Sequence, residues 1–578
     1  MHAVIQKARR MRLTLIIACA ATLLSQAAGA QTQPPRYDIV VRGGEIYDGL
    51  GGPGVAADVA IKGDRIVEIG VIRGKGRREI DARGKAVAPG FINMLSWANE
   101  SMLVDGRAMS DLKQGITLQV MGEGQSMGPL TPEMRAEYVR RQTDLKYPVT
   151  WTTLDEYLTT LERRGISPNV ASFVGAETVR VHAMGSVNRA ATPLELGKMQ
   201  RLVRSAMRDG ALGVASSLIY APGAYANTDE LIALAKAAAP YGGRYISHMR
   251  SEGDRLIEGI DELTRIAREA KIGAEIYHLK MAGADNWPKL AAAVSKVEQA
   301  RAEGLDVTAD MYTYTAGATG FDASMPPWVQ EGGYTAWATR LRDPVIRASV
   351  IAEMRGAANG WENLYRAAGS TDNIITIGFG NPKLKSLTGK TLTEIAAARG
   401  TSPEDTIIDL VIEDGSRVNV AYFLMSEDNV RKQIALPWMS FGSDAEGAAP
   451  EGVFLLSNPH PRAYGNFARL LGRYVRDEKL ITLPEAVRRL TSLPATNLKI
   501  EKRGRLEKGF YADVVVFDPA TISDKATFAG PQRYAVGVSE VIVNGTLVLD
   551  KGEHTGKTAG RVVRGPGWRH NRSGSRKL

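Results

Sequence analysis

Stretches with alternating apolar and polar residues occur at both ends of the chain. The first group lies within residues 31–88 and includes "YDIVVRGGEIYDG", "ADVAIKGDRIVEIG" and "REIDARGKAVAPG". The same pattern returns within residues 496–560, in "GRLEKGFYADVVVFDP" and "VSEVIVNGTLVLDKGEH". Alternation between glycine-containing turns is typical of strands and hairpins. The pattern predicts one small β-sandwich domain that is built from both ends of the chain.

The long middle of the chain, residues 89–495, contains continuous apolar runs separated by amphipathic stretches. Eight runs are consistent with buried strands: "GFINML", "GITLQVMGE", "NVASFVGAE", "LGVASSLIY", "GRYISHMR", "GAEIYHLK", "LDVTADMYTY" and "WMSFGSD". The clearest helix between them is "GDRLIEGIDELTRIAREAKI", because its apolar residues recur at spacings of three and four. Eight strands with helical crossovers predict an α/β fold, a (β/α)₈ TIM barrel, in which reactive groups lie at the carboxyl ends of the strands. Residues from about 325 to 435 do not follow this repeat, so we expect them to form an insertion beside or over the mouth of the barrel.

The formal net charge of +10 comes from the two ends of the chain. Residues 1–30 contain four basic residues, residues 561–578 contain six, and neither segment contains an acid. The body between them is therefore neutral, which argues against a basic surface that binds nucleic acid. We expect the basic tail at 561–578 to be a solvated, disordered end, with contact to an anionic surface as the alternative.

The first 30 residues have the features of a cleavable signal peptide. A basic start is followed by the apolar run "LTLIIACAATLL" and by small residues in "SQAAGA" before Gln31. The run is too short for a resident membrane-spanning helix, and no stable membrane span is expected elsewhere. We expect a mature start near Gln31 and a periplasmic or secreted protein, with a lipoprotein anchored at Cys19 as the alternative. Because Cys19 is the only cysteine, the mature chain would have no disulfide and no thiolate ligand.

Four ionisable residues stand where predicted strands end. His248 ends "YISH", and His278 ends "EIYH" one strand and helix further along. Glu123 follows the second strand in "VMGEG", and Asp444 follows the eighth in "FGSD". A carboxylate at the end of an apolar strand is costly to desolvate unless it binds a cation or hydrogen-bond donors. Each residue alone is compatible with a structural role, but together at one mouth they predict a metal site.

Several long motifs occur in the order that a known enzyme family shows. They include "APGFI", "SSLIYAPGAYA", "SHMRSEGD", "YHLK", "DMYTYTAG", "FGSDAEG", "HPRAYGNFARLLGRYV" and "LTSLPATNL". Through these motifs the chain resembles the N-acyl-D-amino-acid deacylases of the metal-dependent amidohydrolase superfamily, over nearly all of residues 37–565. The resemblance implies a zinc-bearing barrel that hydrolyses the linear amide bond of an N-acyl amino acid.

The chain departs from that family after the first barrel strand. Relatives carry a His-x-His pair there, in a run similar to "GFIDxHxH", whereas this chain has Asn93, Leu95 and Trp97 at the corresponding positions. Relatives also place a cysteine after the second strand, where this chain offers Glu123. The chain therefore resembles a divergent branch in which half of a possible two-metal site is absent.

One zinc ion per chain is accordingly expected, held by Glu123, His248 and His278. Two histidines and a glutamate form a common catalytic zinc set that leaves one position for water. Zinc lowers the pKa of such a water towards about 7 and polarises the amide carbonyl. Asp444 is the expected catalytic residue, because it can take the proton from the water and pass it to the leaving nitrogen.

The expected substrate-binding residues are Lys280, Tyr312, Arg250, Leu95 and Trp97. The resemblance implies that Lys280 meets the substrate carboxylate and that Tyr312 supports the reacting carbonyl group. Leu95 and Trp97 would form an apolar wall against the acyl chain, with simple space filling as the alternative. Arg250 is a candidate for substrate binding whose alternative is an ion pair with an acid.

The expected function is zinc-dependent hydrolysis of a small N-acyl amino acid, in particular a D-amino acid derivative. Arg462 is a further candidate for substrate binding, with an ion pair to an acid as the alternative. His182 and His460 are interpreted as structural, the latter as a residue that orients the "HPR" turn. Two alternatives stay open: a hydrolase of the same fold that acts on dipeptides, cyclic amides or esters, and a non-catalytic binding protein. Retention of the two strand-end histidines and of Asp444 argues against the second alternative.

Overall fold

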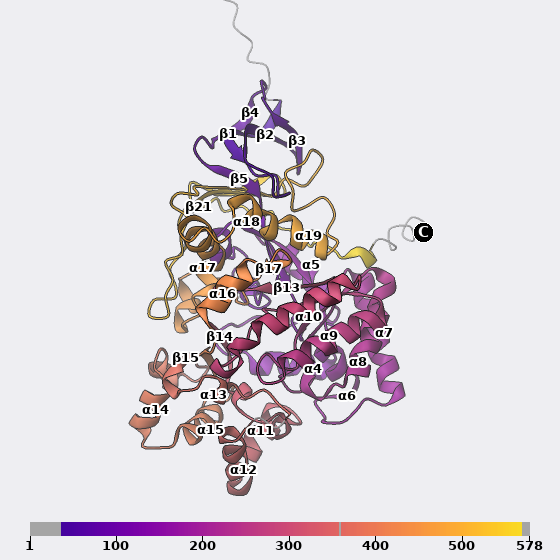
Figure 1. The fold of residues 1–578 in the computed structure, drawn as a ribbon, viewed down its shortest axis with the longest axis vertical. Coiled ribbons are helices and arrows are strands. Elements are labelled where there is room, and N and C mark those ends of the chain that lie inside the picture. The colour runs from indigo at the N-terminus through magenta and orange to yellow at the C-terminus, as the bar shows by residue number, and fades with distance from the viewer. Residues whose placement is uncertain (1–35, 358–359, 569–578) are drawn as a thin grey trace, which may run out of the picture.

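The computed structural model describes residues 36–357 and 360–568 (Figure 1). The expected signal peptide at residues 1–30 lies outside the described residues, as does the end of the expected tail, residues 569–578. Across the two described ranges, no helix combines the length and the apolar character needed to cross a membrane.

Strands from both ends of the chain form one nine-stranded sheet in the upper part of Figure 1. Its members are β1 (Tyr37–Ile46), β2 (Val55–Lys62), β3 (Arg65–Gly70), β4 (Gly76–Asp81), β5 (Ala86–Pro89), β18 (Val514–Phe517), β19 (Val538–Val543), β20 (Thr546–Asp550) and β21 (Glu553–His554). Antiparallel pairing of β5 with β18 joins the N-terminal strands to the C-terminal ones. At the opposite edge, the Ile66 amide donates to the Phe510 carbonyl at 3.0 Å and the Ala512 amide donates to the Asp64 carbonyl at 2.9 Å. The sheet therefore curls on itself, and apolar residues of its N-terminal and C-terminal strands share one core, among them Val59, Ile66 and Val514.

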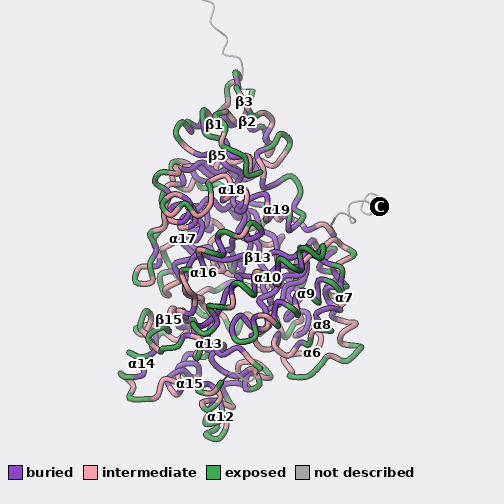
Figure 2. Tube along the Cα trace, viewed as in Figure 1, coloured by how far each residue is buried: buried purple, intermediate pink, exposed green. Residues whose placement is uncertain are grey.

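Each of the eight apolar runs in the middle of the chain forms a parallel strand, and Phe173 divides the third run into two short strands. The strands are β6 (Phe91–Asn93), β7 (Ile116–Met121), β8 (Asn169–Ser172), β9 (Val174–Gly175), β10 (Gly213–Ser217), β11 (Arg244–His248), β12 (Gly273–Ile276), β13 (Val307–Met311) and β17 (Met439–Phe441). They form two sheets, with the orders β6-β7-β8 and β17-β13-β12-β11-β10-β9. Nearly all of their residues are buried (Figure 2), which explains why the sequence shows continuous apolar runs there instead of alternation. The molecule thus has a mixed α/β fold with parallel sheets.

Helices follow most of these strands and pack outside them. They are α2 (Ser101–Val104), α3 (Met109–Leu112), α4 (Pro132–Arg141), α5 (Leu154–Arg164), α6 (Ala176–Met184), α7 (Pro193–Asp209), α8 (Thr228–Ala238), α9 (Leu256–Ala270), α10 (Leu290–Ala302), α16 (Glu427–Ile434), α17 (Arg462–Arg469), α18 (Leu483–Leu490) and α19 (Ser492–Asn497). In α9, Leu256, Ile260, Leu263 and Ala267 recur at spacings of three and four and are buried, whereas Glu258 is exposed. α7, α8, α9 and α10 pack against one another in that order, on the right of Figure 1. This layer holds the ends of the strands, and the loops that follow them, in fixed positions.

The chain between β13 and α16 builds a separate unit at the bottom of Figure 1. It contains β14 (Ala316–Gly320), α11 (Tyr334–Leu341), α12 (Pro344–Arg355), α13 (Leu364–Ala367), β15 (Ile374–Gly378), α14 (Leu392–Arg399), α15 (Pro403–Asp414) and β16 (Asn419–Phe423). Its strands form an antiparallel sheet in the order β14-β16-β15, and its apolar core includes Phe321, Trp337 and Tyr422. The unit starts at β14, ahead of the expected start at residue 325. α16 packs with the main core through Val430 and Ile434 and lies outside the insertion.

Residues 561–568 are packed against the body of the protein, which corrects the expectation of a solvated tail from residue 561. Arg561 pairs with Asp64 at 2.6 Å. The Val563 amide donates to the Val170 carbonyl at 2.8 Å, and the Val563 side chain is buried. The segment is ordered because its charge and its backbone both find partners that lie far away in the sequence.

Candidate metal centre and active site

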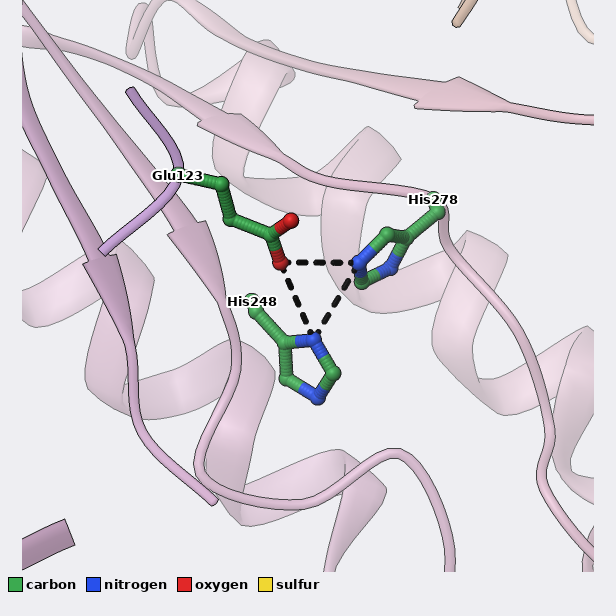
Figure 3. Close-up of side chains that lie close together, drawn as sticks. All are labelled: Glu123, His248 and His278. Atoms are coloured by element: carbon green, nitrogen blue, oxygen red, sulfur yellow. Dashed lines mark hydrogen bonds and ion pairs between the residues drawn. The ribbon is translucent and has the colours of Figure 1, made fainter. Parts of the chain in front are cut away.

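Glu123, His248 and His278 converge at the carboxyl ends of parallel strands (Figure 3). Glu123 follows β7, His248 is the last residue of β11, and His278 follows β12. Oε1 of Glu123 lies 3.2 Å from Nδ1 of His248 and 3.1 Å from Nε2 of His278, and these two nitrogens are 3.1 Å apart. All three side chains are buried. The structure thus brings the three expected metal ligands together.

The chemistry and spacing of these donors fit a zinc ion. Ligand atoms that lie about 2.0–2.1 Å from a tetrahedral ion are separated from one another by about 3.3 Å, which is close to the distances found here. Burial by itself would raise the pKa of the Glu123 carboxyl, but hydrogen bonds with His248 and His278 hold that pKa well below its usual range. The carboxylate is therefore ionised, as a metal ligand must be.

Glu252, which is absent from the residues expected above, lies behind both histidine rings. Its Oε1 is 2.9 Å from Nδ1 of His278, and its Oε2 is 3.5 Å from Nε2 of His248. A carboxylate behind a metal-binding histidine fixes the orientation and the tautomer of the ring. Burial tends to raise the pKa of Glu252, but His248, Lys280 and His278 together hold it below its usual range. The signal in the sequence was the acid of "SEGD", which follows His248 by four residues.

The loop after β6 brings Trp97 to the same centre. Its indole N–H donates to Oε2 of Glu123 at 3.0 Å and to Oδ1 of Asp444 at 3.1 Å. The side chain is 39% exposed, while its polar edge faces the two carboxylates. The indole therefore serves as a hydrogen-bond donor to both carboxylates, in addition to the apolar surface that the sequence predicts.

Asp444 follows β17 and is oriented by contacts on its backbone and its side chain. Its φ is 50°, a left-handed conformation that is uncommon outside glycine and persists where the surroundings impose it. Its amide donates to the Leu95 carbonyl at 2.9 Å, and its Oδ2 lies 2.9 Å from Nη1 of Arg462. Burial raises the pKa of Asp444 above its ordinary value, and Arg462 opposes that rise. The side chain is therefore held towards Trp97 and the metal ligands.

Tyr312 and Arg462 carry buried donors that have no partner. Among the described residues, the Tyr312 hydroxyl and Nε of Arg462 make no hydrogen bond. The Arg462 guanidinium lies 4.4 Å from the centre of the Tyr312 ring, which in turn lies 6.3 Å from the ring of His278. Buried polar groups are costly to leave unpaired. These two donors therefore mark a place where polar groups of a ligand would bind.

Two residues that were expected to bind substrate are paired with acids instead. Lys280 is buried, and its ammonium group lies 2.7 and 2.8 Å from the two carboxylate oxygens of Glu252. Arg250 pairs with Glu262 at 2.9 Å and also donates to two backbone carbonyl groups. Because an acid neutralises each cation, the structure does not place either one as a free substrate-binding group.

Leu95, His460 and His182 are not among the polar groups that face the candidate metal site. Leu95 has 0% exposure and belongs to the apolar interior with Leu118 and Tyr277, so the expectation that it lines an acyl pocket is corrected. His460 is buried, and its Nδ1 accepts the backbone N–H of Arg462 at 3.0 Å, which orients the turn that carries this arginine. His182 lies on α6, in its last turn.

Known proteins resemble this chain over nearly its whole length. The model of the amidohydrolase family matches residues 78–549. The D-aminoacylase of Alcaligenes xylosoxydans xylosoxydans is 32% identical over 539 residues, which cover 92% of this chain and 99% of that protein. A solved D-aminoacylase, described in terms of one-metal activation and second-metal attenuation at a binuclear metal centre, is 32% identical, with a TM-score of 0.75 over 91% of this chain and 100% of its own.

A second solved structure is similar to the same degree. It is the N-acyl-D-glutamate deacylase from Bordetella bronchiseptica, complexed with zinc and a phosphonate inhibitor that mimics the tetrahedral intermediate. It is 30% identical, with a TM-score of 0.75 over 91% of this chain and 99% of its own. Sequence and structure therefore point to the same group of proteins.

Proposed function

The chain belongs to the amidohydrolase family, and on that basis we propose that it is a metal-dependent hydrolase that splits N-acyl amino acids, those of D-amino acids in particular, into a carboxylate and an amino acid. The observation that carries this function is the convergence of Glu123, His248 and His278 beside Asp444, which combines a metal-binding set with a proton acceptor. The activities named for the relatives, D-aminoacylase and N-acyl-D-glutamate deacylase, support the same bond and substrate class.

The proposal includes a closed (β/α)₈ barrel around this centre. Hydrogen bonding continues across the gaps between the two parallel sheets and supports closure. The Leu212 amide, just before β10, donates to the Ser172 carbonyl of β8 at 3.0 Å, and Ser96 and Ala445 form a parallel bridge beyond β6 and β17. A closed barrel would gather the carboxyl ends of all the strands at one mouth.

One zinc ion per chain would be held by Glu123, His248 and His278. When bound, it supplies a Lewis acid that polarises the amide carbonyl and lowers the pKa of a bound water. Glu252 would keep the His278 ring in the orientation that the ion requires, and its second oxygen lies 3.5 Å from Nε2 of His248. The zinc in the solved N-acyl-D-glutamate deacylase and the one-metal activation described for D-aminoacylase support this assignment.

Asp444 carries the proton in the proposed reaction. Its carboxylate accepts a proton as water adds to the carbonyl carbon, and it donates that proton to the leaving nitrogen as the amide bond breaks. Arg462 and the Trp97 N–H each contact one of its oxygens, at 2.9 and 3.1 Å, and keep it pointed at the reacting atoms. Burial raises its pKa and thereby makes the carboxylate a stronger base towards the proton of the water, while Arg462 opposes that rise.

Arg462 and Tyr312 are the residues that we assign to substrate binding. The guanidinium group of Arg462 would bind the substrate carboxylate, because its planar set of N–H groups matches two carboxylate oxygens. The Tyr312 hydroxyl would donate to the carbonyl oxygen. Among the described residues, the Tyr312 hydroxyl and Nε of Arg462 are buried donors without a hydrogen bond, although Nη1 of Arg462 also pairs with Asp444 at 2.9 Å. Lys280 and Arg250 are paired with Glu252 and Glu262.

The proposal also places the protein outside the cytoplasm, in the periplasm or the medium. Its support is the basic start, the apolar run and the small residues that precede Gln31. N-terminal sequencing of protein purified from its native cells should find a start near Gln31. A mature chain that begins at Met1, or that carries a lipid on Cys19, would overturn this part.

A substrate panel tests the proposed reaction. Purified protein is assayed with N-acetyl derivatives of D- and L-amino acids, together with dipeptides, cyclic amides and esters. We expect release of acetate from members of the D series, loss of that activity on chelation, and recovery when zinc is returned. Cleavage confined to dipeptides, cyclic amides or esters would assign the site to another bond, and no turnover by zinc-loaded protein would favour a binding protein.

A pair of histidine variants provides the control for this panel. His278→Ala removes one proposed ligand and should abolish both bound zinc and activity. His182→Ala removes a histidine of α6 and should leave both unchanged.

A further inference from the structure

The indole N–H of Trp97 is shared by two carboxylates of the centre. It lies 3.0 Å from Oε2 of Glu123 and 3.1 Å from Oδ1 of Asp444. Two neighbouring carboxylates repel each other unless a positively charged or hydrogen-bond-donating group lies between them. An indole nitrogen is a donor only, so it can fill this role but cannot bind a cation. A donor that belongs to the protein thus occupies the position between the two acids.

The oxygens of these acids have separate partners. Oε1 of Glu123 faces the two histidines, whereas its Oε2 faces Trp97. The two oxygens of Asp444 also have different partners: Oδ1 faces Trp97 and Oδ2 faces Arg462. An ion that entered between Glu123 and Asp444 would have to displace the Trp97 N–H.

Backbone contacts hold Trp97 in this place. Its own amide donates to the Ala445 carbonyl at 2.9 Å, and the Ser96 amide donates to the Val120 carbonyl at 2.8 Å. Ala445 follows Asp444 directly, and Val120 belongs to β7, which leads to Glu123. The segment with the indole is therefore tied to both strands whose acids it bridges.

We propose that the Trp97 indole N–H replaces a second metal ion in this centre. It bridges Glu123 and Asp444 and holds Asp444 in its position for proton transfer. It also occupies the space between the two carboxylates and so excludes a further cation. Trp97 is thus a positioning residue that also sets the metal content at one ion per chain. The effect on turnover rests on the proposed function, whereas the metal content can be measured without it.

Counting bound metal tests whether Trp97 excludes a second ion. Holoprotein of the wild type, Trp97→His and Trp328→His is dialysed to equilibrium against increasing free zinc, and bound zinc is counted as the difference between the protein and the protein-free compartments. The wild type should keep one ion per chain even in excess zinc. Trp97→His adds an imidazole beside two freed carboxylate oxygens and should bind a second, weaker ion. Two ions on the wild type, or one ion on Trp97→His, would overturn the inference.

Trp328 is a matched control for this substitution. Its side chain is 37% exposed, and its indole N–H donates to the Glu353 carboxylate at 2.9 Å. Trp328→His therefore makes the same chemical change beside a single acid and should still bind one ion.

Steady-state kinetics test the positioning role. Trp97→Phe keeps an aromatic ring but lacks the N–H, so kcat should fall about tenfold or more with little change in KM, since a hydrogen bond to a charged group is lost. Bound zinc in this variant, counted alongside, separates this loss from loss of metal. Trp328→Phe should behave as the wild type. Unchanged kcat in Trp97→Phe would overturn the positioning role.

The two proposals fail in different ways. If no compound of the substrate panel is cleaved, the zinc counts of the wild type and Trp97→His still decide whether Trp97 excludes a second metal ion. If the wild type cleaves N-acyl-D-amino acids and binds two zinc ions, the proposed function stands and the inference about Trp97 is overturned.

Discussion

At the scale of single residues, Asp444 is the group on which turnover should depend most directly. Asp444→Asn keeps the shape of the side chain and one of its two accepting oxygens, but it cannot take a proton. Turnover should therefore fall about 10²- to 10⁴-fold, while one zinc ion per chain remains bound. Steady-state kinetics together with metal analysis of the variant provide the measurement. A rate close to that of the wild type would mean that another group takes the proton.

Leu95 makes the opposite contribution, because it affects stability and not the substrate. Its side chain has 0% exposure in the apolar interior, so Leu95→Ala should lower the free energy of unfolding by about 2–5 kcal/mol. The preference among acyl chains should stay as it is. Leu455, with 55% exposure, is the control, and Leu455→Ala should change the free energy of unfolding by less than about 0.5 kcal/mol. A changed acyl preference with normal stability would show that Leu95 contacts the substrate.

At the scale of elements, the short helix α3 buries a carboxyl group whose ionisation should destabilise the protein. Burial raises the pKa of Asp111 to about 7, against opposing hydrogen bonds from Gln119, Ser110 and Asn93. An acid with a raised pKa in the folded state stabilises that state in its protonated form. This contribution is complete below about pH 4 and is lost as the pH rises through about 7.

The substitution Asp111→Asn removes this dependence on pH. Above about pH 7, the variant should exceed the wild type in free energy of unfolding by roughly 1–4 kcal/mol, and the difference should narrow towards about pH 5. Chemical denaturation at the two pH values is the measurement, with Asp372→Asn, at an exposed position, as the control. A difference that grows towards acid pH would contradict the sign argued here.

At the scale of the whole molecule, a buried polar network joins the curled sheet to the parallel strands. Asp513, which precedes β18, forms an ion pair with Arg503 and accepts the Asn544 amide at 2.8 Å. The Asn544 side chain then donates to Oδ1 of Asn169 in β8 at 2.7 Å. The two parts of the fold are therefore connected by paired polar groups as well as by apolar packing.

Breaking this network should destabilise both parts together. Asp513→Ala leaves Arg503 buried without its acid and should lower the free energy of unfolding by about 3–5 kcal/mol. The double variant Asp513→Ala/Arg503→Met should recover part of that loss, and Asp81→Ala, which breaks an exposed pair with Arg83, should cost little. Denaturation followed by circular dichroism is the measurement. A double variant as unstable as Asp513→Ala would show that the unpaired charge is not the cause.

Local patterns in the sequence were sufficient for most elements of the fold but failed at two boundaries. The parallel strands are recognisable because burial on both faces produces continuous apolar runs, and α9 because its buried residues follow the helical period. β14, with the sequence "AGATG", has small, half-buried residues and no alternation, so the start of the insertion was placed too late. Residues 561–568 were expected to be solvated because of their arginines, whereas Arg561 finds its acid, Asp64, almost at the other end of the chain.

The sequence by itself pointed to four of the side chains that the structure brings to the centre, but not to Glu252. Glu123, His248, His278 and Asp444 each end or follow an apolar run, and parallel strands bring their carboxyl ends to one edge. Only the tertiary structure decided what each polar group contacts: Lys280 is paired with Glu252, and the Trp97 N–H is shared by Glu123 and Asp444. The physical reason is the separation along the sequence over which each kind of interaction acts. Periodicity and burial act along a segment and can be read from it, whereas ion pairs and hydrogen bonds depend on which distant residues the packing brings within about 3 Å.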